Sequence, residues 1–386
     1  MYKVYVKQAW QMLRQNGFIS VIAIVGTALA IMMIMVVILT DKVQNVNMAP
    51  EIHRDQTLYV NEHMQYDTTG GNDRSRGGNI RYSLAKEYLL GLKTPELISV
   101  VNSYMSDVLW LVNRQGSGET FDALLRTTDA NYWQLMSFSF LAGRPFSREE
   151  FNSGMQVAVL SQSMAARLFP GEDPVGKTIE IKFVPFRVLG VVKDVSPVFR
   201  EAYGDVWVPV TAQEEYGNNG MIVMMLMRDK ADREAIFREI LESERRFHLT
   251  NAPWTLYLAG PHDRRVYSMN IRDWFDHESE GPVIRTQYRK RALILLVLLL
   301  VPAVNLTGFS LSRMKKRMAE IGVRKAFGAK RRTILAQVLY ENMLTSLIGG
   351  LLGLALSYPA LYGLRHWLLG IPAGGDVPAA TMLSLP

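Results

Sequence analysis

RMKKRMAEIGVRKAFGAKRR, residues 313–332, is the stretch that decides how the chain is arranged. Apolar segments flank it on both sides, and it carries nine lysines and arginines against a single acid, Glu320. Short loops this basic stay on the cytoplasmic side of a membrane. The sequence therefore predicts a cytoplasmic loop between two membrane-spanning helices. The basic residues are Arg313, Lys315, Lys316, Arg317, Arg324, Lys325, Lys330, Arg331 and Arg332.

The loop also carries a helical pattern. Residues 314–325 contain no proline, and Met314, Met318 and Ile321 recur three or four positions apart. Gly328 follows as a helix C-cap before the next helix starts. A loop held only by the charge of anionic lipids is the simpler alternative.

The first membrane span is expected at residues 18–40. Within it, residues 18–39 are 22 residues without a charge, roughly 33 Å as a helix, which is enough to cross. A cleaved signal peptide is the alternative, but its apolar region is about 7–15 residues long and ends at small residues. This run is longer and ends in Thr40-Asp41-Lys42. Residues 1–17 are expected to form an amphipathic helix at the cytoplasmic interface.

Two further spans are expected after the middle of the chain. Residues 285–312 would form a stalk and the second span, residues 313–332 the cytoplasmic loop, and residues 333–370 the third span with its extension. Residues 377–386 number only ten, too few for another membrane span. Residues 371–386 are expected to be an extracytoplasmic tail, without a fourth span.

Polar and small residues mark the third span. Gly349 and Gly353 form a GxxxG pattern that allows close helix packing, although the same pattern also arises by chance. Glu341 is either a functional residue turned toward the helix bundle or a residue at headgroup level, if the span begins near Met343.

The charge of the chain is divided between its middle and its ends. Residues 41–284 hold 26 Lys/Arg and 33 Asp/Glu, whereas the rest of the chain holds 17 and 3. The excess of basic residues therefore flanks the apolar segments, and this distribution excludes nucleic acid as the partner. There is no cysteine, so disulfides and thiolate metal sites are excluded. The six histidines lack paired-ligand spacing, and no metal site is predicted.

Residues 41–284 are expected to form an α+β domain on the extracytoplasmic side, of one or two lobes. Helical and strand-like patterns are interspersed along this region. The predicted helices are 84–92, 161–169 and 231–247. The predicted strands are 99–102, 108–113, 157–161, 178–183, 186–192, 206–210 and 221–227.

Residues 171–178, GEDPVGKT, match the phosphate-binding P-loop pattern GxxxxGK[ST]. A P-loop follows a strand and opens a helix whose N-terminal amides hold the phosphates. Here the preceding segment is helical and the following one is a strand, and Glu172 and Asp173 occupy the place of the phosphates. We therefore interpret the match as false and expect no ATPase activity, and no bound cofactor, on this chain.

The basic loop at residues 313–332 resembles the coupling loop of MacB/FtsX-type ABC transporter permeases, and the resemblance implies the same coupling role for it. The resemblance lies in residues 320–326, EIGVRKA, in Gly328, Ala329 and Arg332, and in Gln337 and Glu341. A second resemblance, to the periplasmic core domain of MacB-like permeases, lies in Tyr132-Trp133, in residues 143–146 and 157–161, in residues 173–177 and in residues 186–192. Together the two cover nearly the whole chain, in the family's order.

The resemblance implies a fold, a location and partners. The fold is a membrane protein with an α-helical transmembrane bundle and an inserted α+β periplasmic domain, in the bacterial inner membrane with a cytoplasmic N-terminus. The partners are ABC ATPase subunits, which bind ATP and Mg, a second or homologous permease forming a dimer, membrane lipid, and a periplasmic adaptor. The residues implied in contacting the ATPase are Arg317, Glu320, Ile321, Gly322, Arg324, Lys325, Gly328 and Arg332.

The expected function is that of a transmembrane subunit that couples ATP hydrolysis by a separate ATPase to conformational change in the periplasm. Its cargo would be a substrate such as a peptide, an antibiotic or a lipoprotein. The alternative is an FtsX-like regulatory subunit that activates a cell-wall hydrolase or a sensor and moves no cargo. A membrane-tethered binding module without an ATPase would leave the EIGVRKA loop unexplained.

Overall fold

The computed structural model describes residues 17–69, 74–103, 109–218, 220–269, 277–316 and 331–364, and residues 318, 322–323 and 326–327 between the last two ranges. The chain divides into two compact units. We call Gln44–Arg285 the α+β unit, and Met1–Val43 with Thr286–Pro386 the helical unit. The expected N-terminal helix at residues 1–16 and the tail at residues 371–386 lie outside the described residues.

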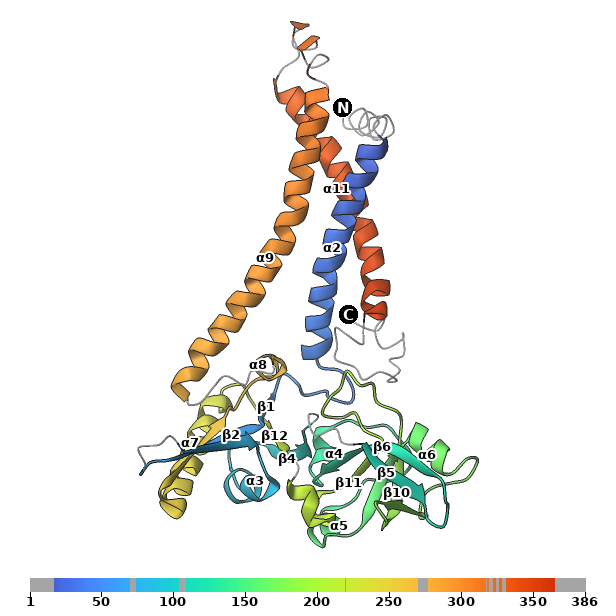
Figure 1. Cartoon of the computed structure of the whole chain (residues 1–386), viewed down its shortest axis with the longest axis vertical. Coiled ribbons are helices and arrows are strands. Elements are labelled where there is room, and N and C mark those ends of the chain that lie inside the picture. The colour runs from blue at the N-terminus through green and yellow to red at the C-terminus, as the bar shows by residue number, and fades with distance from the viewer. Residues whose placement is uncertain are drawn as a thin grey trace. The chain divides into compact units, whose positions relative to one another are not determined.

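The helical unit is built from long helices, which Figure 1 shows as the elongated ribbons. They are α2 (Gly17–Asn45), α9 (His277–Lys316), whose first turns belong to the α+β unit, and α11 (Arg331–Gly363). By length and composition, two stretches of the described helices could cross a membrane, Ser20–Asn45 and Asn342–Gly363. The second predicted span lies within α9 and stays a prediction.

Helices α2 and α11 pack closely because small residues meet between them. A Cβ added to Gly349 would lie 2.8 Å from the Cβ of Thr27, and one added to Gly353 would lie 2.6 Å from the carbonyl oxygen of Ala28. Only hydrogen fits at such distances, so the two backbones approach as they do in GxxxG contacts. Arg291 of α9 reaches Asp41 of α2 with an N–O distance of 3.9 Å.

The α+β unit contains two sheets. Its strands are β1 (Thr57–Val60), β2 (Glu62–Asp67), β3 (Ser75–Asn79), β4 (Leu97–Asn102), β5 (Leu109–Arg114), β6 (Thr120–Thr128), β7 (Phe140–Gly143), β8 (Val157–Ser161), β9 (Thr178–Ile181), β10 (Val184–Val192), β11 (Val206–Pro209), β12 (Met221–Leu226) and β13 (Trp254–Ala259). Its helices are α3 (Tyr82–Tyr88), α4 (Tyr132–Leu135), α5 (Arg148–Asn152), α6 (Gln162–Leu168), α7 (Asp232–Asn251) and α8 (Arg264–Ser268), with 3-10 turns η2 (Val210–Ala212) and η3 (Glu214–Asn218).

Six strands of the larger sheet close into a ring. The ring runs β6-β11-β8-β10-β9-β5, and β5 returns to pair with β6. Strand β7 pairs with β10 outside it, and β4, β12 and β1 continue the sheet beyond β6. A closed ring leaves its members no open edge, which protects an all-β core without disulfides.

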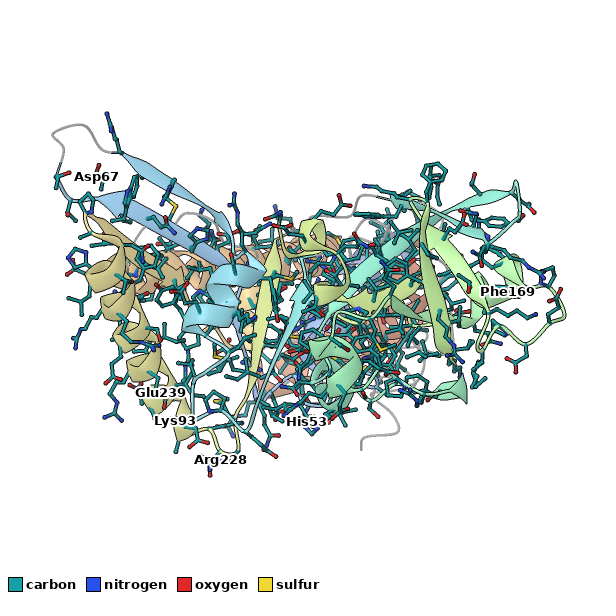
Figure 2. The ribbon with its side chains drawn as sticks, turned by 90° about the horizontal axis from the view of Figure 1, so that it is seen from below. His53, Asp67, Lys93, Phe169, Arg228 and Glu239 are labelled. Atoms are coloured by element: carbon teal, nitrogen blue, oxygen red, sulfur yellow. The ribbon has the colours of Figure 1, made fainter. Side chains whose placement is uncertain are left out.

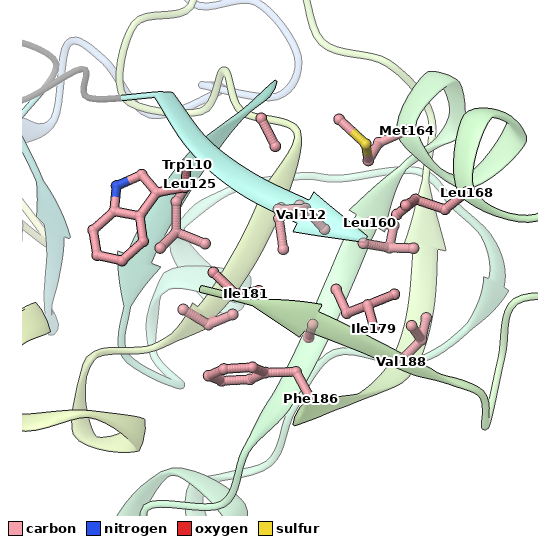
Figure 3. Packing of buried hydrophobic residues seen from close by; sticks show 14 of the residues in the cluster. Trp110, Val112, Leu125, Leu160, Met164, Leu168, Ile179, Ile181, Phe186 and Val188 are labelled. Atoms are coloured by element: carbon pink, nitrogen blue, oxygen red, sulfur yellow. The ribbon is translucent and has the colours of Figure 1, made fainter. Parts of the chain in front are cut away.

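Branched and aromatic side chains fill the ring (Figure 3). Val112, Leu160, Ile181, Phe186 and Val188 come from four different strands, and all are fully buried. Helix α6 adds Met164 and Leu168 to the same cluster. Successive side chains of a β-strand point to opposite faces of the sheet, so every second residue of a strand points into the ring.

A second core lies where helices α3 and α7 cover strands β1, β12 and β4 together with β13. Ile236 and Ile240 of α7 are buried there against Val100, Val223 and Leu258. In the first half of α7, Glu239 accepts hydrogen bonds from the backbone N–H groups of Lys93 and Thr94, at 2.9 and 3.3 Å (Figure 2). The smaller sheet, β13-β2-β3, borders this core.

Most predicted elements of this unit are confirmed. All seven predicted strands and all three predicted helices overlap observed ones, and the strand at residues 157–161 has the predicted bounds. The hairpin of β2 and β3 was not predicted, because EHMQYD and SRGGN lack the apolar alternation of a half-buried strand.

The turn between β9 and β10 predicts a stability effect. Lys182 and Phe183 form it with φ of 47° and 69°, and Phe183 is 90% exposed. A side chain at positive φ is strained, so Phe183→Gly should raise the free energy of unfolding by about 0.5–1 kcal/mol. Thermal unfolding of the whole chain, followed by tryptophan fluorescence, measures this. Phe183→Ala retains the Cβ and serves as the control. Equal melting temperatures of the two variants would contradict strain at this position as the cause.

Candidate functional site

Four charged side chains form a buried network in the α+β unit. They are Glu51, Arg54, Glu201 and Arg264, each exposing 5% of its surface or less. Glu51 and Arg54 follow the end of α2 in sequence, Glu201 lies in the loop between β10 and β11, and Arg264 opens α8. The network therefore joins three segments that are far apart in the sequence.

Each arginine of the network pairs with a carboxylate and with a backbone carbonyl. Arg54 donates from Nε to Glu51 at 2.6 Å and from Nη1 to the carbonyl of Val46 at 3.1 Å. Arg264 donates from Nη1 to Glu201 at 2.6 Å and from Nε to the carbonyl of Gln44 at 3.0 Å. The carbonyls bound here belong to the residues at and just after the end of α2.

Two tyrosines complete the network. The hydroxyl of Tyr267 donates to the second oxygen of Glu201 at 2.9 Å, and its ring stacks on Tyr59 with centroids 4.4 Å apart. The Tyr132 hydroxyl donates to the backbone carbonyl of Glu201 at 2.9 Å. Glu201 is thus bound by Arg264, Tyr267 and Tyr132.

The network is stable only as a whole. Burial raises the pKa of Glu201, but the charge and hydrogen bonds of Arg264 and the hydroxyl of Tyr267 outweigh it and lower that pKa to about 2. Breaking one partner of a buried pair costs about 3–5 kcal/mol, because the other charge is left without compensation. The charges of the two arginines and the two glutamates cancel, so the network offers no net charge to a ligand. Its effect is to hold segments of the chain together.

The predicted coupling residues are described only in part. Arg317, Glu320, Ile321, Arg324, Lys325 and Gly328 lie outside the described residues. Gly322 is helical and exposed, with open space where a Cβ would stand, and Arg332 is an exposed residue at the start of α11. Their contact with an ATPase stays a prediction.

The predicted polar residue Glu341 lies within α11, and its side chain is outside the described part of the chain. Both alternatives for Glu341 therefore stay open. Gly349 and Gly353, in contrast, are placed against α2 of the same chain.

The segment with the P-loop pattern is a surface turn. Helix α6 precedes it and strand β9 follows it, which is the reverse of the order in a P-loop. Glu172 within the turn forms ion pairs with Lys177 and with Arg114, the latter at 3.0 Å. Both cations also lie over the ring of Phe169. The lysine that would reach a phosphate is thus bound to a carboxylate of its own loop.

Sequence reasoning missed the buried network. Glu51 and Arg54 are three positions apart in a polar stretch, and nothing in the pattern around Glu201 or Arg264 distinguishes them from solvated residues. Charged residues are almost always exposed unless paired, and the pairing here is made by tertiary contacts alone.

Two family models match the chain. The model of the MacB-like periplasmic core domain matches residues 20–243, more than half of the chain, and the model of the FtsX-like permease C-terminal region matches residues 292–380. These matches define the class as MacB/FtsX-type ABC transporter permeases. The chain belongs to the family of the MacB-like periplasmic core domain, as the sequence resemblance predicted.

Two curated relatives illustrate the similarity. The uncharacterized ABC transporter permease YknZ of Bacillus subtilis is 26% identical over 242 residues, which cover 62% of this chain and 57% of YknZ. The macrolide export ATP-binding/permease protein MacB of Bdellovibrio bacteriovorus is 31% identical over 230 residues, which cover 58% of this chain and 34% of MacB. The match thus spans little more than half of the first relative and about a third of the second.

Among solved structures, the periplasmic region of MacB from Actinobacillus actinomycetemcomitans matches with a TM-score of 0.38 at 17% identity, covering 55% of this chain and 94% of that one. The extracellular domain of YknZ from Gram-positive bacteria matches with a TM-score of 0.37 at 17% identity, covering 52% and 98%.

Removing one arginine tests the network. Arg264→Met should lower the free energy of unfolding by about 3–5 kcal/mol, because Glu201 stays buried without its partner. Arg265→Met, in the same helix but exposed, is the matched control and should change it by about 0.5 kcal/mol or less. Urea unfolding of the whole chain in detergent measures both. Equal effects of the two substitutions would show that the network contributes no stability.

Acid should weaken the network in a defined range. The folded pKa of Glu201 is about 2, below the value of about 4.3 in an unfolded chain. The stabilisation is therefore complete above about pH 4.5 and is lost as the pH falls toward 2, with a slope of up to about 1.4 kcal/mol per pH unit. Glu201→Gln should flatten the fall of the melting temperature in this range. The exposed control Glu242→Gln should leave it unchanged; a flattening of equal size in both would contradict the assignment.

Proposed function

We propose that the chain is a transmembrane subunit that transmits movement from a cytoplasmic ATPase to its own periplasmic α+β unit. The observation that carries the proposal is α9, a single helix of 40 residues. At 1.5 Å per residue it is roughly 60 Å long, about twice the hydrocarbon core of a bilayer. A continuous helix of this length carries a displacement from one end to the other.

The first residue of α9 is fixed to the α+β unit. The Nε2 of His277 lies 3.1 and 3.0 Å from the two carboxylate oxygens of Glu244 on α7, and the ring packs edge-on against Tyr257 and Phe237. Glu244 also accepts the backbone N–H of Leu258 at 2.7 Å. A movement of α9 therefore acts on α7 and β13 together.

The buried network supports the same mechanism at the other connection. It fixes the carbonyls of Gln44 and Val46, at the end of α2, to Arg264 and Arg54. Since α8 precedes α9 along the chain, the network holds the entering and leaving segments of the α+β unit to each other. Movement of one of these segments would therefore move the other segment as well.

The other end of α9 leads into the basic stretch at residues 313–332. Its nine cations suit an acidic docking surface on an ATPase subunit, which would bind ATP and Mg. A pair of permeases, formed by two copies or by homologous chains, would then respond to two ATPase subunits. The chain itself supplies no catalytic group in this mechanism.

Export is the outcome that the relatives support. Relatives are named for export of macrolides and, in Pseudomonas syringae, of syringafactin. The cargo would be of a similar kind, such as a peptide, an antibiotic or a lipoprotein, presented in the periplasm. An FtsX-like regulator without cargo would share the coupling step and differ only in what the α+β unit contacts.

Charge reversal in the basic stretch tests the coupling step. Arg324→Glu with Lys325→Glu should reduce co-purification of the ATPase at least about tenfold, because like charges would face each other at the docking surface. Co-purification from detergent-solubilised membranes measures the contact, and the amount of permease in the membrane controls for insertion.

Arg238→Glu with Arg245→Glu is the matched control, since both residues are exposed on α7 of the α+β unit. This control should retain the ATPase. Retention of the ATPase by the first variant as well, at equal membrane level, would refute docking through residues 313–332.

A further inference from the structure

A groove of about 570 Å³ lies beside the smaller sheet of the α+β unit. Its walls come from the β2–β3 hairpin, from α3 and from the last turns of α7. Figure 2 shows this hairpin projecting, with Asp67 near its far end. The volume is in the range of small-molecule sites, about 300–1,000 Å³. The network described above contributes no residue to it.

The floor of the groove follows from the register of the hairpin. His63 pairs with Gly78 and Gln65 with Arg76, so all four positions lie on one face of the sheet. Gly78 has no side chain, and a Cβ placed there would meet nothing within 4 Å. The space opposite His63 therefore stays open, and this space is part of the groove.

The arginines that line the groove pair with no carboxylate of the described residues. Among the described residues, no ion pair is formed by Arg76 or Arg81, which both line the groove and act on His63 electrostatically. Arg76 is held in place by Gln65, to which its Nε donates at 2.7 Å, and by the ring of Trp254, 4.3 Å from its guanidinium. Within the described part of the chain its two terminal nitrogens make no hydrogen bond, and a guanidinium in this state suits bidentate recognition of an oxyanion.

His63 adds a polar atom to the lining of the groove. Its Nδ1 is buried and has no hydrogen-bond partner within the described part of the chain. Burial lowers the pKa of His63, so the ring is neutral at neutral pH. A buried polar atom without a partner is uncommon in a folded protein unless a ligand or water completes it.

The described lining also has apolar residues. Leu84 and Tyr88 of α3 and Phe247 of α7 belong to it, and Glu87 is the one acid among the described residues that line the groove. Arg76 and Arg81 against Glu87 leave the charge of this described lining positive by one. We propose that the groove binds a small molecule that carries a carboxylate or phosphate group, with this group on Arg76 and Arg81 and its carbon skeleton against Leu84, Tyr88 and Phe247.

Titration calorimetry of the whole chain in detergent tests this site. The probes are succinate, inorganic phosphate and, as a neutral molecule of similar size, glucose. We expect saturable binding of at least one anion, with a dissociation constant on the order of 1 mM, and none of glucose. Binding of succinate alone would identify a carboxylate ligand, and binding of phosphate alone would identify a phosphate ligand.

Two variants locate the binding. Arg76→Gln should weaken it at least about tenfold, through loss of the bidentate contact. Ser83→Phe places a ring from an exposed position of α3 into the groove, without changing any charge, and should also abolish binding. Arg238→Gln, exposed on α7 and outside the groove, is the matched control and should bind as the unmodified chain does.

The proposal fails if neither anion binds saturably. It fails equally if Arg76→Gln and Ser83→Phe bind with the affinity of Arg238→Gln, because the anion would then occupy another place. Melting temperatures of all variants, measured without ligand, separate loss of binding from loss of the fold. Neither result depends on an ATPase partner.

Discussion

The need to compensate buried charge organises the α+β unit. Glu51, Arg54, Glu201 and Arg264 are withdrawn from water, and each is tolerated only because its partners are present at hydrogen-bond distance. The arginines also hold the carbonyls at the end of α2. The start of the unit, its central loop and the segment before α9 therefore fold together or not at all.

The rest of the unit is rigid for a different reason. A chain without cysteine must resist deformation through its own core, and the ring of six strands closes upon a continuous set of branched side chains. Helix α7 covers the second core, and its Glu239 and Glu244 hold the neighbouring segments by backbone hydrogen bonds. Close-packed cores of this kind are hard to compress, which suits the mechanical role proposed above.

The helical unit shows how close packing is reached without buried charge. Gly349 and Gly353 let α11 approach α2 until carbonyl oxygens and small side chains touch, which is how helices associate where lipid is as apolar as the side chains. This contact lies within one chain. A second permease would need another surface, and α9 exposes Leu293, Leu296 and Leu300 along its length.

Much was determined by the sequence alone, because it depends on local pattern. The predicted first and third spans overlap the two described stretches that could cross a membrane by length and composition, and strands such as residues 157–161 could be located by runs of branched residues. The family followed from motifs that stand close together in the chain. The charged network and the groove could not be predicted from the sequence. The role of Glu51 and Arg264, or of His63 and Arg81, depends on residues that are distant in sequence and close only in the folded chain. Only the tertiary structure decides which charged side chains are buried. Desolvation depends on the atoms that surround a side chain in space and not on its neighbours along the chain.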